Sequence, residues 1–364
     1  MVRYLGAVSI ALCVAGIGLL GVANAQSVED ISAMNGMSAQ QMNAALIASH
    51  FREEQAEVAQ LPAYFPKSKT DAGTFPPDIQ KILNLPEDQI DTGVAALTFA
   101  KEIYPNLDVV AYSSQLNDMA RHAKATIERF GKHDPISVIQ ALNTYYHFEF
   151  RAQYDFAPDG RKNRDNYFLN RIMDRHMGQC ETLPMLYMAI AQRLGYPVYA
   201  VHAPEHSFLR YVDPSLPGGA INIEVSGRQI SWLSDAGYAH WLNINDRAIK
   251  GGAFLRTLTR RQWLGLLLEE NAVVFSKAGY WDRAILYVKK AQELDPQDPY
   301  YPKNLAQAYE VKAQRTEARD LAEKYMKMSH NEAALAESMG WVNDPDALTR
   351  ADAMRANALA KGTQ

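Results

Sequence analysis

The chain has 364 residues, of which 48% are hydrophobic and 21% charged, a composition typical of a globular protein with two or three domains. This composition excludes a disordered chain, a collagen-like repeat and a disulfide-rich scaffold. The disulfide-rich scaffold is excluded because the only cysteines are Cys13 and Cys180. The 37 basic and 41 acidic residues leave a net charge of −4, so no overall positive field attracts nucleic acid or an anionic membrane. Partners must therefore be recognised at a local site.

The first 25 residues have the pattern of a secretory signal peptide. Arg3 provides a positive start, residues 4–22 are apolar and uncharged, and residues 23–25 (ANA) supply the small side chains that signal peptidase recognises. The pattern predicts cleavage after Ala25 and an exported, periplasmic protein. The alternative is an uncleaved inner-membrane anchor, because the apolar run approaches the ~20 residues that span a bilayer.

Removal of the signal peptide leaves 364 − 25 = 339 residues and a single cysteine, Cys180. An unpaired thiol in an oxidising compartment is exposed to oxidation and mispairing. Its presence therefore indicates either a buried small hydrophobe or a nucleophile. Composition alone leaves both interpretations open.

The segment that follows the signal peptide is predicted to be mainly helical. Residues 38–60 have the periodicity of an amphipathic helix, and residues 61–77, which contain Pro, Gly and Lys, are predicted to form an extended connector. Three further helices are predicted at residues 89–103, 113–130 and 135–147.

The periodicity changes after the turn at Gly178. A helix is predicted from Cys180 to about Leu194, where Gly195 ends it. Four short β-branched or aromatic runs follow, separated by turns, at residues 197–201, 207–212, 220–225 and 228–232. A helix followed by adjacent strands predicts an α+β domain with an antiparallel sheet.

Beyond residue 258 the chain is again helical and has a 34-residue period. The matching positions are Ala272, Phe275, Gly279, Ala284, Ala291 and Pro296 in the first copy, and Ala306, Tyr309 and Ala318 in the second. Small and aromatic residues at these spacings are typical of tetratricopeptide helical hairpins. Because two copies are fewer than the roughly three that an independent array needs, this region is expected to pack on the preceding domain. It would serve either as a stabilising cap or as a groove that binds a peptide.

Cys180 lies at the first turn of its predicted helix, where the positive end of the helix dipole favours a thiolate. A thiolate nucleophile needs a base, and His206 opens the second strand 206 − 180 = 26 residues downstream, far enough for the chain to return. On the next strand, Asn222 and Glu224 point to the same face, so either could orient the imidazole.

Residues 202–206 (HAPEH) also match the H-x-x-E-H pattern of inverted zinc peptidases. That motif requires a helix that brings both histidines to one face, and Pro204 does not permit a helix there. No metal site is therefore predicted. The sequence also lacks a phosphate-binding loop, a dinucleotide fingerprint and a paired-cysteine site, so no cofactor is predicted.

Residues 166–211 resemble the transglutaminase-like superfamily of papain-type folds, in particular its bacterial invasion-regulator-like branch with C-terminal tetratricopeptide repeats. The matching features are Gly-x-Cys at the start of a helix, Leu-Gly at its end, and a Pro-x-His-x-x-x-Arg strand. The resemblance implies a transglutaminase-like domain at residues 88–258 and helical repeats at residues 259–340. An N-terminal helix and linker, residues 26–87, would precede them, and a C-terminal helix or tail, residues 341–364, would follow.

In that superfamily a cysteine is the nucleophile, a histidine the base, and an acidic residue on the next strand orients the histidine. The resemblance assigns the first two roles to Cys180 and His206. Where the family usually has Asp-Pro this chain has Ile-Glu-Val-Ser, so Glu224 is the preferred third residue and Asn222 the reserve. Gln179, beside the nucleophile, could bind an oxyanion together with the Cys180 amide.

These assignments predict an exported cysteine-dependent acyl-transfer enzyme acting on a peptide, protein or peptidoglycan-peptide amide. Water as the acceptor would make it a peptidase or amidase, and an amine would make it a transglutaminase-type crosslinker. The alternative is a non-catalytic scaffold whose repeats bind a partner protein or peptide. Nucleic acid is not an expected partner, and a membrane is one only if the N-terminal segment stays uncleaved.

Overall fold

The computed structural model describes residues 72–157, 159–227 and 233–353. The chain divides into two units at residues 61 and 62, and every described residue belongs to the second unit. The predicted signal peptide, the predicted helix at residues 38–60 and the predicted strand at residues 228–232 lie outside the described residues. Within the ranges that are described, no helix has the length and apolar character needed to cross a bilayer.

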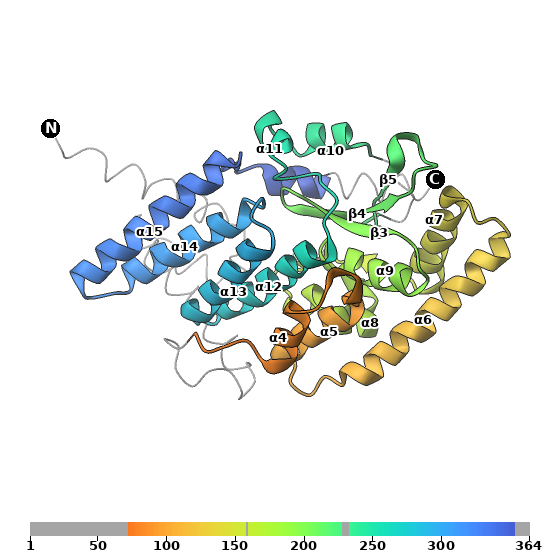
Figure 1. The fold of residues 1–364 in the computed structure, drawn as a ribbon, viewed down its shortest axis with the longest axis horizontal. Coiled ribbons are helices and arrows are strands. Elements are labelled where there is room, and N and C mark those ends of the chain that lie inside the picture. Colours follow the sequence, from red (N-terminus) through yellow and green to blue (C-terminus); the bar gives the residue numbers. More distant parts are fainter. Residues whose placement is uncertain (1–71, 158, 228–232, 354–364) are drawn as a thin grey trace, which may run out of the picture. The chain divides into compact units, whose positions relative to one another are not determined.

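The second unit consists of two groups of helices with a small sheet between them in the sequence (Figure 1). The first group contains α4 (Pro77–Leu83), α5 (Thr92–Ile103), α6 (Val109–Phe130), α7 (Pro135–Thr144), α8 (Leu169–Arg175) and α9 (Thr182–Arg193). The strands are β3 (Val198–Ala203), β4 (His206–Val212) and β5 (Ala220–Ile223), and a short parallel pair is formed by β1 (Gln153–Tyr154) and β2 (Met177–Gly178). The second group contains α10 (Asp235–Trp241), α11 (Asp246–Lys250), α12 (Arg260–Lys277), α13 (Trp281–Leu294), α14 (Tyr300–Gln314) and α15 (Arg319–Ser338). This order is consistent with the predicted α+β class.

Capping side chains move two helix starts away from the predicted positions. Asp91 accepts a hydrogen bond from Val94 N at 2.9 Å, so α5 begins three residues later than predicted. Asp108 accepts from Val110 N at 3.0 Å, so α6 begins four residues earlier. The third predicted helix ends at Thr144, because the chain continues there as a π-helical turn.

Helix α9 is the buried centre of the first group. Every residue from 182 to 191 is buried, and α9 packs against α5, α6, α8, β3 and β4. The approach is close enough that a Cβ atom at Gly93 on α5 would lie 3.2 Å from Ala189 Cβ and 2.7 Å from Leu116 Cδ1. A helix packed on all sides must be apolar on all sides, which accounts for its sequence.

Strands β3, β4 and β5 form an antiparallel sheet in that order, as predicted. Ala203 pairs with His206, so the β3–β4 turn has only two residues, Pro204 and Glu205. Glu205 has a φ of 54°, a left-handed conformation that costs a non-glycine residue about 1–2 kcal/mol. Proline followed by a residue with positive φ is the pattern of a type II turn, where glycine is usual at the second position.

A second apolar core covers the face of the sheet that carries Val201, Ala203 and Phe208. Residues of α10 and α11 and the loop that follows them pack there, together with Ala351 near the end of the described chain. The rings of Phe208 and Tyr238 are stacked, with centroids 3.8 Å apart and planes at 5°. The chain therefore returns to the sheet after α15.

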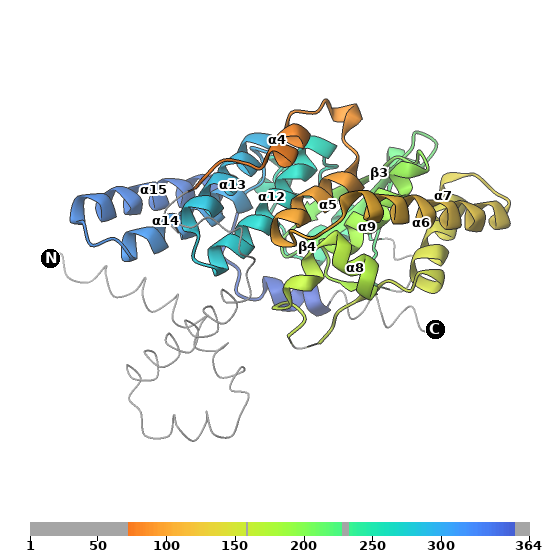
Figure 2. The same ribbon diagram turned by 90° about the horizontal axis from the view of Figure 1, so that it is seen from below.

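The C-terminal helices form two hairpins, α12 with α13 and α14 with α15 (Figures 1 and 2). Most residues at the predicted 34-residue period are buried in them: Ala272, Phe275, Ala284, Ala291, Ala306 and Tyr309. Ala318 differs, because it is exposed at the N-cap of α15 instead of lying between helices. The helical hairpins are thus observed, and their assignment as tetratricopeptide repeats stays a prediction.

The C-terminal helices are tied to the first group by the buried carboxylate of Glu102 on α5. Its two oxygens accept hydrogen bonds from Arg283 Nε at 3.1 Å and from Asn271 Nδ2 at 3.2 Å, and Tyr287 Oη donates to it as well. Arg283 and Tyr287 belong to α13 and Asn271 to α12. The C-terminal helices therefore pack on the preceding region, as expected, and the predicted boundary at residues 258 and 259 falls inside one compact unit.

Candidate active site

Cys180 lies in the turn that leads into α9, two residues before the first helical residue. Leu183 N donates to Gln179 O at 3.0 Å, so this turn is already hydrogen-bonded like the first turn of a helix. The cysteine is only 2% exposed. The structure thus places Cys180 at the helix entrance, as the sequence predicted, and also buries it.

The thiol has two polar neighbours, a carboxylate and a backbone carbonyl oxygen. Sγ donates to Glu181 Oε1 at 3.1 Å and lies 3.9 Å from the carbonyl oxygen of Glu205. The first contact sets a carboxylate against the thiol, which stabilises the protonated sulfur. The second places the sulfur beside the peptide bond between Glu205 and His206, so α9 and β4 meet at this point.

His206, the first residue of β4, is paired with Glu224. Its Nε2 lies 2.7 Å from Glu224 Oε2, and both residues are 1% exposed. The other ring nitrogen, Nδ1, is buried and has no hydrogen-bond partner among the described residues. A buried polar atom without a partner costs free energy, and it leaves this nitrogen available to a bound molecule or to a side chain that moves. One ring nitrogen of His206 is therefore held by a carboxylate while the other remains open.

The carboxylate of Glu224 is satisfied on both oxygens. Oε2 also accepts from Tyr238 Oη at 3.0 Å, and Oε1 accepts from Ser226 N at 2.8 Å. Burial alone would raise the pKa of Glu224, but the His206 ring and these hydrogen bonds lower it to about 2. Burial and the Glu224 carboxylate raise the pKa of Tyr238 well above its usual value, so its hydroxyl remains a donor. Glu224 is thus an ionised, fixed partner for the imidazole.

The register of the sheet explains why His206 pairs with Glu224 and not with Asn222. Arg210 lies directly opposite Asn222, which places Asn222 four residues along the ladder from His206. Asn222 Oδ1 accepts from Arg210 Nε at 2.9 Å, and its Nδ2 donates to Leu233 O and Asp235 Oδ1, each at 2.8 Å. The reserve candidate is therefore engaged in a separate network.

Gln179 does not stand free beside the nucleophile. Its side-chain Nε2 donates to Asp155 O at 3.0 Å, and the residue is 1% exposed. This bond uses one of the two amide hydrogens and fixes the carboxamide to the segment after β1. The predicted oxyanion role of Gln179 stays a prediction, and the backbone amide of Cys180 at the helix entrance is the other candidate donor.

Two residues of the site were not predicted from the sequence. Tyr238 donates to Glu224 and its ring lies 5.9 Å from that of His206, but it comes from α10, far from any strand pattern. Glu181 contacts the thiol, and its position directly after the cysteine was the only local signal. The contact between Tyr238 and Glu224 spans 14 residues, so no local pattern could indicate the role of Tyr238.

The three polar side chains of the H-x-x-E-H segment have different partners. His202 Nδ1 lies 2.6 Å from Asp298 Oδ2, Glu205 Oε1 accepts from a tyrosine of α14, and His206 pairs within the sheet. The register sets Ala203 opposite His206, so the two histidines point to opposite faces. In the part of the chain that the structure describes, no three His, Cys, Asp or Glu side chains are grouped to hold a metal ion.

Two carboxyl groups of α12, Glu269 and Glu270, lie in the same electrostatic environment as Glu181. Burial and the carboxylates of Glu181 and Glu269 raise the pKa of Glu270 well above its usual value. Burial and the like charge of the Asp298 carboxylate raise the pKa of Glu269 to about 7. The site thus combines a nucleophile candidate and an ordered base with nearby carboxyl groups whose raised pKa values favour their neutral form.

Residues 110–264 match the family model of the transglutaminase-like superfamily. Two relatives, both named UPF0162 protein, come from Xylella fastidiosa strains 9a5c and Temecula1 / ATCC 700964. Each is 24% identical over 247 residues, which is 65% of this chain and 84% of the relative. No solved structure gives a significant match.

The matched region contains the nucleophile candidate Cys180, the His206–Glu224 pair and the whole β3–β5 sheet. It begins in α6 and ends early in α12, so it overlaps most of the domain predicted at residues 88–258. A transglutaminase-like superfamily domain therefore occupies residues 110–264 of this chain.

Proposed function

We propose that this protein is an exported cysteine-dependent acyl-transfer enzyme that acts on a peptide or protein amide. The observation that carries the proposal is the buried His206–Glu224 pair, whose second imidazole nitrogen is open, on the strand that begins beside Cys180. The transglutaminase-like superfamily match supports the same class of chemistry.

In the proposed reaction His206 removes the proton of the Cys180 thiol, and the thiolate attacks the amide carbonyl. A C–S bond forms as the carbonyl π electrons move to oxygen, and the tetrahedral oxyanion would be stabilised by the Cys180 amide. Collapse breaks the C–N bond, and His206 returns the proton to the leaving amine. Water or a second amine then resolves the thioester, which regenerates the thiol.

Glu224 would hold the imidazole throughout this cycle. With Nε2 bound to the carboxylate, the ring presents Nδ1 as the nitrogen that exchanges protons. The charge of Glu224 would also stabilise the imidazolium that forms after proton transfer, and its low pKa keeps that charge present above about pH 3.

The Cys180 thiol donates a hydrogen bond to Glu181 Oε1 in the observed arrangement, which in the proposed cycle is the resting state of the nucleophile. Reaction requires the thiol to leave this carboxylate and pass its proton to His206. Because Cys180 is 2% exposed, the acyl donor must also displace what covers the sulfur, and Glu181 is a partly exposed side chain in contact with it.

The pH dependence of Cys180 alkylation tests the proposal. We expect iodoacetamide to label the folded protein at pH values below the usual thiol pKa of ~8.5, and we expect this reactivity to be lost in His206→Ala. Cys180→Ala shows the background. Slow labelling at all pH values in both proteins would overturn the enzyme proposal.

The acceptor is decided by a second measurement. A fluorescent primary amine incorporated into a glutamine-containing peptide would indicate transglutaminase-type transfer, whereas release of ammonia or of a cleaved peptide would indicate an amidase or peptidase. A peptidoglycan-derived peptide is the substrate to try first if the protein is exported as proposed.

A non-catalytic scaffold is the second candidate, and one observation favours it. A groove between α14 and α15 is lined by Ala313, Ala322 and Met326 together with polar residues such as Glu323 and Lys327. Such a surface would suit a peptide. The two functions separate in a deletion strain, because Cys180→Ala should fail to complement if the protein is an enzyme and should complement if it is a scaffold. Met326→Glu should have the opposite pattern.

A further inference from the structure

The β3–β4 turn lies beside the nucleophile candidate Cys180. Its second residue, Glu205, places its carbonyl oxygen 3.9 Å from Cys180 Sγ, and the next residue is the candidate base His206. Any movement of this turn would therefore change the position of the base relative to the sulfur. The geometry of the turn is a condition for the proposed reaction.

This turn is not held by its own conformational preference. Glu205 occupies the left-handed region at a φ of 54°, where glycine is usual, and no glycine is present in the two-residue turn. A strained conformation persists only where surrounding contacts impose it, and such residues cluster at functional sites. Contacts from outside the turn must therefore impose this conformation.

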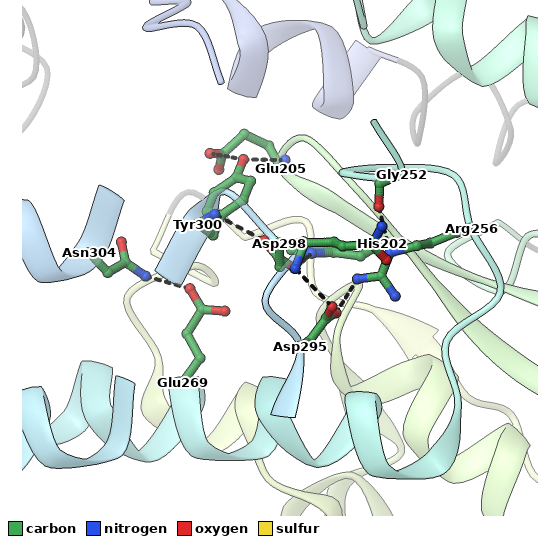
Figure 3. A network of polar contacts seen from close by, with 10 residues as sticks. His202, Glu205, Gly252, Arg256, Glu269, Asp295, Asp298, Tyr300 and Asn304 are labelled. Atoms are coloured by element: carbon green, nitrogen blue, oxygen red, sulfur yellow. Dashed lines mark hydrogen bonds and ion pairs between the residues drawn. The ribbon is translucent and has the colours of Figure 1, made fainter. Parts of the chain in front are cut away.

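They come from the N-terminal end of α14, 95 residues away. The hydroxyl of Tyr300 accepts a hydrogen bond from Glu205 N and donates to Glu205 Oε1, each at 3.0 Å, so one side chain fixes both the backbone and the side chain of the strained residue (Figure 3). Burial and the Glu205 carboxylate raise the pKa of Tyr300 well above its usual value, so this hydroxyl keeps its proton.

The other side of the turn is held from the same segment. Asp298 Oδ2 lies 2.6 Å from His202 Nδ1 on β3, and Asp298 Oδ1 accepts from Tyr300 N at 2.9 Å (Figure 3). The rings of His202 and Tyr300 lie 5.2 Å apart. Asp298 is 1% exposed and is therefore a rigid anchor for both.

We infer that Tyr300 is a positioning residue of the candidate active site, which it serves by holding the Pro204–Glu205 turn and thereby His206 against Cys180. The start of α14 is then part of the catalytic apparatus and not only a cap or a peptide-binding repeat. This inference rests on the proposed function, since it assigns Tyr300 a role in the same reaction.

Tyr300→Phe tests it, because phenylalanine keeps the ring and removes both hydrogen bonds. We expect the rate constant for Cys180 alkylation to fall about tenfold, as small misplacements of catalytic groups do, with its pH profile moved toward that of His206→Ala. The matched control is Tyr301→Phe: Tyr301 is 0% exposed, and its hydroxyl has no hydrogen-bond partner among the described residues. It should label like the wild-type protein.

A second variant separates positioning from general destabilisation. Glu205→Gly removes the strain at the positive φ. The double variant with Tyr300→Phe and Glu205→Gly should therefore recover most of the alkylation rate that Tyr300→Phe alone loses. Equal labelling of wild-type protein and Tyr300→Phe, an equal loss in Tyr301→Phe, or no recovery in the double variant would overturn the inference.

Hydrogen exchange distinguishes a failure of this inference from a failure of the proposed function. Exchange in a peptide covering residues 198–212 should be faster in Tyr300→Phe than in wild-type protein and unchanged in Tyr301→Phe. If the wild-type thiol proves unreactive, the enzyme proposal fails, and exchange still decides whether Tyr300 holds the turn. Unchanged exchange in Tyr300→Phe would overturn that holding role directly.

Discussion

Two histidine–carboxylate pairs lie on one β-hairpin, and they differ in what surrounds them. His206 and Glu224 are 2.7 Å apart and both belong to the sheet region, whereas His202 and Asp298 are 2.6 Å apart and join β3 to the segment before α14. The first pair leaves a buried ring nitrogen without a partner among the described residues. The second belongs to the contacts that hold the turn. The same kind of pair can thus belong to a candidate catalytic site or to the packing of the fold. The two cases are distinguished by the second ring nitrogen of the histidine and by the segment that supplies the carboxylate.

The pKa shifts in the two pairs also have opposite signs. Burial would raise the pKa of Glu224, but His206 and the hydrogen bonds to Glu224 lower it to about 2, so that pair is lost in acid. Burial would lower the pKa of His202, but the Asp298 carboxylate raises it to about 9, so that pair is lost in alkali. At neutral pH both are intact, and each can be removed separately by pH or by substitution.

The largest expected effect separates the two histidines by reactivity. His206→Ala should lower the rate of Cys180 acylation by about 10²–10⁴, the usual contribution of a general acid–base group, while His202→Ala should lower it less than tenfold. Rates with a peptide amide or an activated ester measure the difference. Equal losses in both variants would contradict the separation of roles.

The next effect concerns stability. Asp298→Asn removes one partner of a buried pair and should lower the free energy of unfolding by about 3–5 kcal/mol, measured by urea denaturation. The control is Asp246→Asn, at a pair whose two side chains are largely exposed and which should change stability by less than about 1 kcal/mol. A loss of similar size in both variants would argue against a structural role for Asp298.

A pH series tests the sign of the His202 shift. Its folded pKa of about 9 exceeds its ordinary value of 6.5, so its stabilising contribution is complete below pH 6.5 and disappears as pH rises through 9. We expect the free energy of unfolding to fall by up to about 3 kcal/mol between pH 6 and pH 9. Glu269, with a pKa raised to about 7, adds to the fall between pH 4.5 and 7.

His202→Gln is the variant that isolates this contribution. It should flatten the curve above pH 7 and leave the acid side unchanged, where Glu224 loses its stabilising charge as pH falls from 4.5 through about 2. An unchanged slope above pH 7 in His202→Gln would show that other groups cause the alkaline loss.

The choice between Glu224 and Asn222 can be tested by reactivity. Glu224→Gln keeps the size of the side chain and removes its charge, and it should slow acylation about tenfold through a weaker hold on the imidazole. Asn222→Ala should affect stability more than rate, because Asn222 bonds to Arg210 and Asp235. A larger rate loss in Asn222→Ala would reverse the assignment.

The smallest expected effect concerns Glu181. Because the thiol donates to this carboxylate, Glu181→Gln should make alkylation at neutral pH a few times faster by removing a charge that opposes the thiolate. Glu323→Gln, far from the thiol in the α14–α15 groove, should have no effect. Slower labelling of Glu181→Gln would indicate that Glu181 assists the reaction.

Local sequence patterns were sufficient to predict the helix and the strands that carry the site. The three described strands lie close to their predicted positions, because alternation of side chains over four to seven residues is a local property. The buried helix that follows Cys180 was also predicted. Its end at Leu194 and Gly195, with a φ of 80° at the glycine, follows from short-range conformational preference.

Contacts between distant segments could not be predicted in the same way. Asn222 and Glu224 have the same parity on one strand, and only the register with β4 sets Glu224 near His206 and Asn222 opposite Arg210. Tyr238 and Tyr300 reach the site from helices that carry no motif. Such roles depend on packing, which no short window of sequence contains.

The sequence by itself determined the helix entrance at Cys180, the antiparallel strands and the resemblance that joined Cys180 and His206 with either Glu224 or Asn222. These follow from local periodicity and from residue types that few alternatives share. The tertiary structure alone decided which ring nitrogen of His206 is held, that the thiol rests on Glu181, and that Tyr300 fixes the strained turn. The physical reason is that hydrogen bonds across tens of residues exist only once the core has set the register and the approach of the helices.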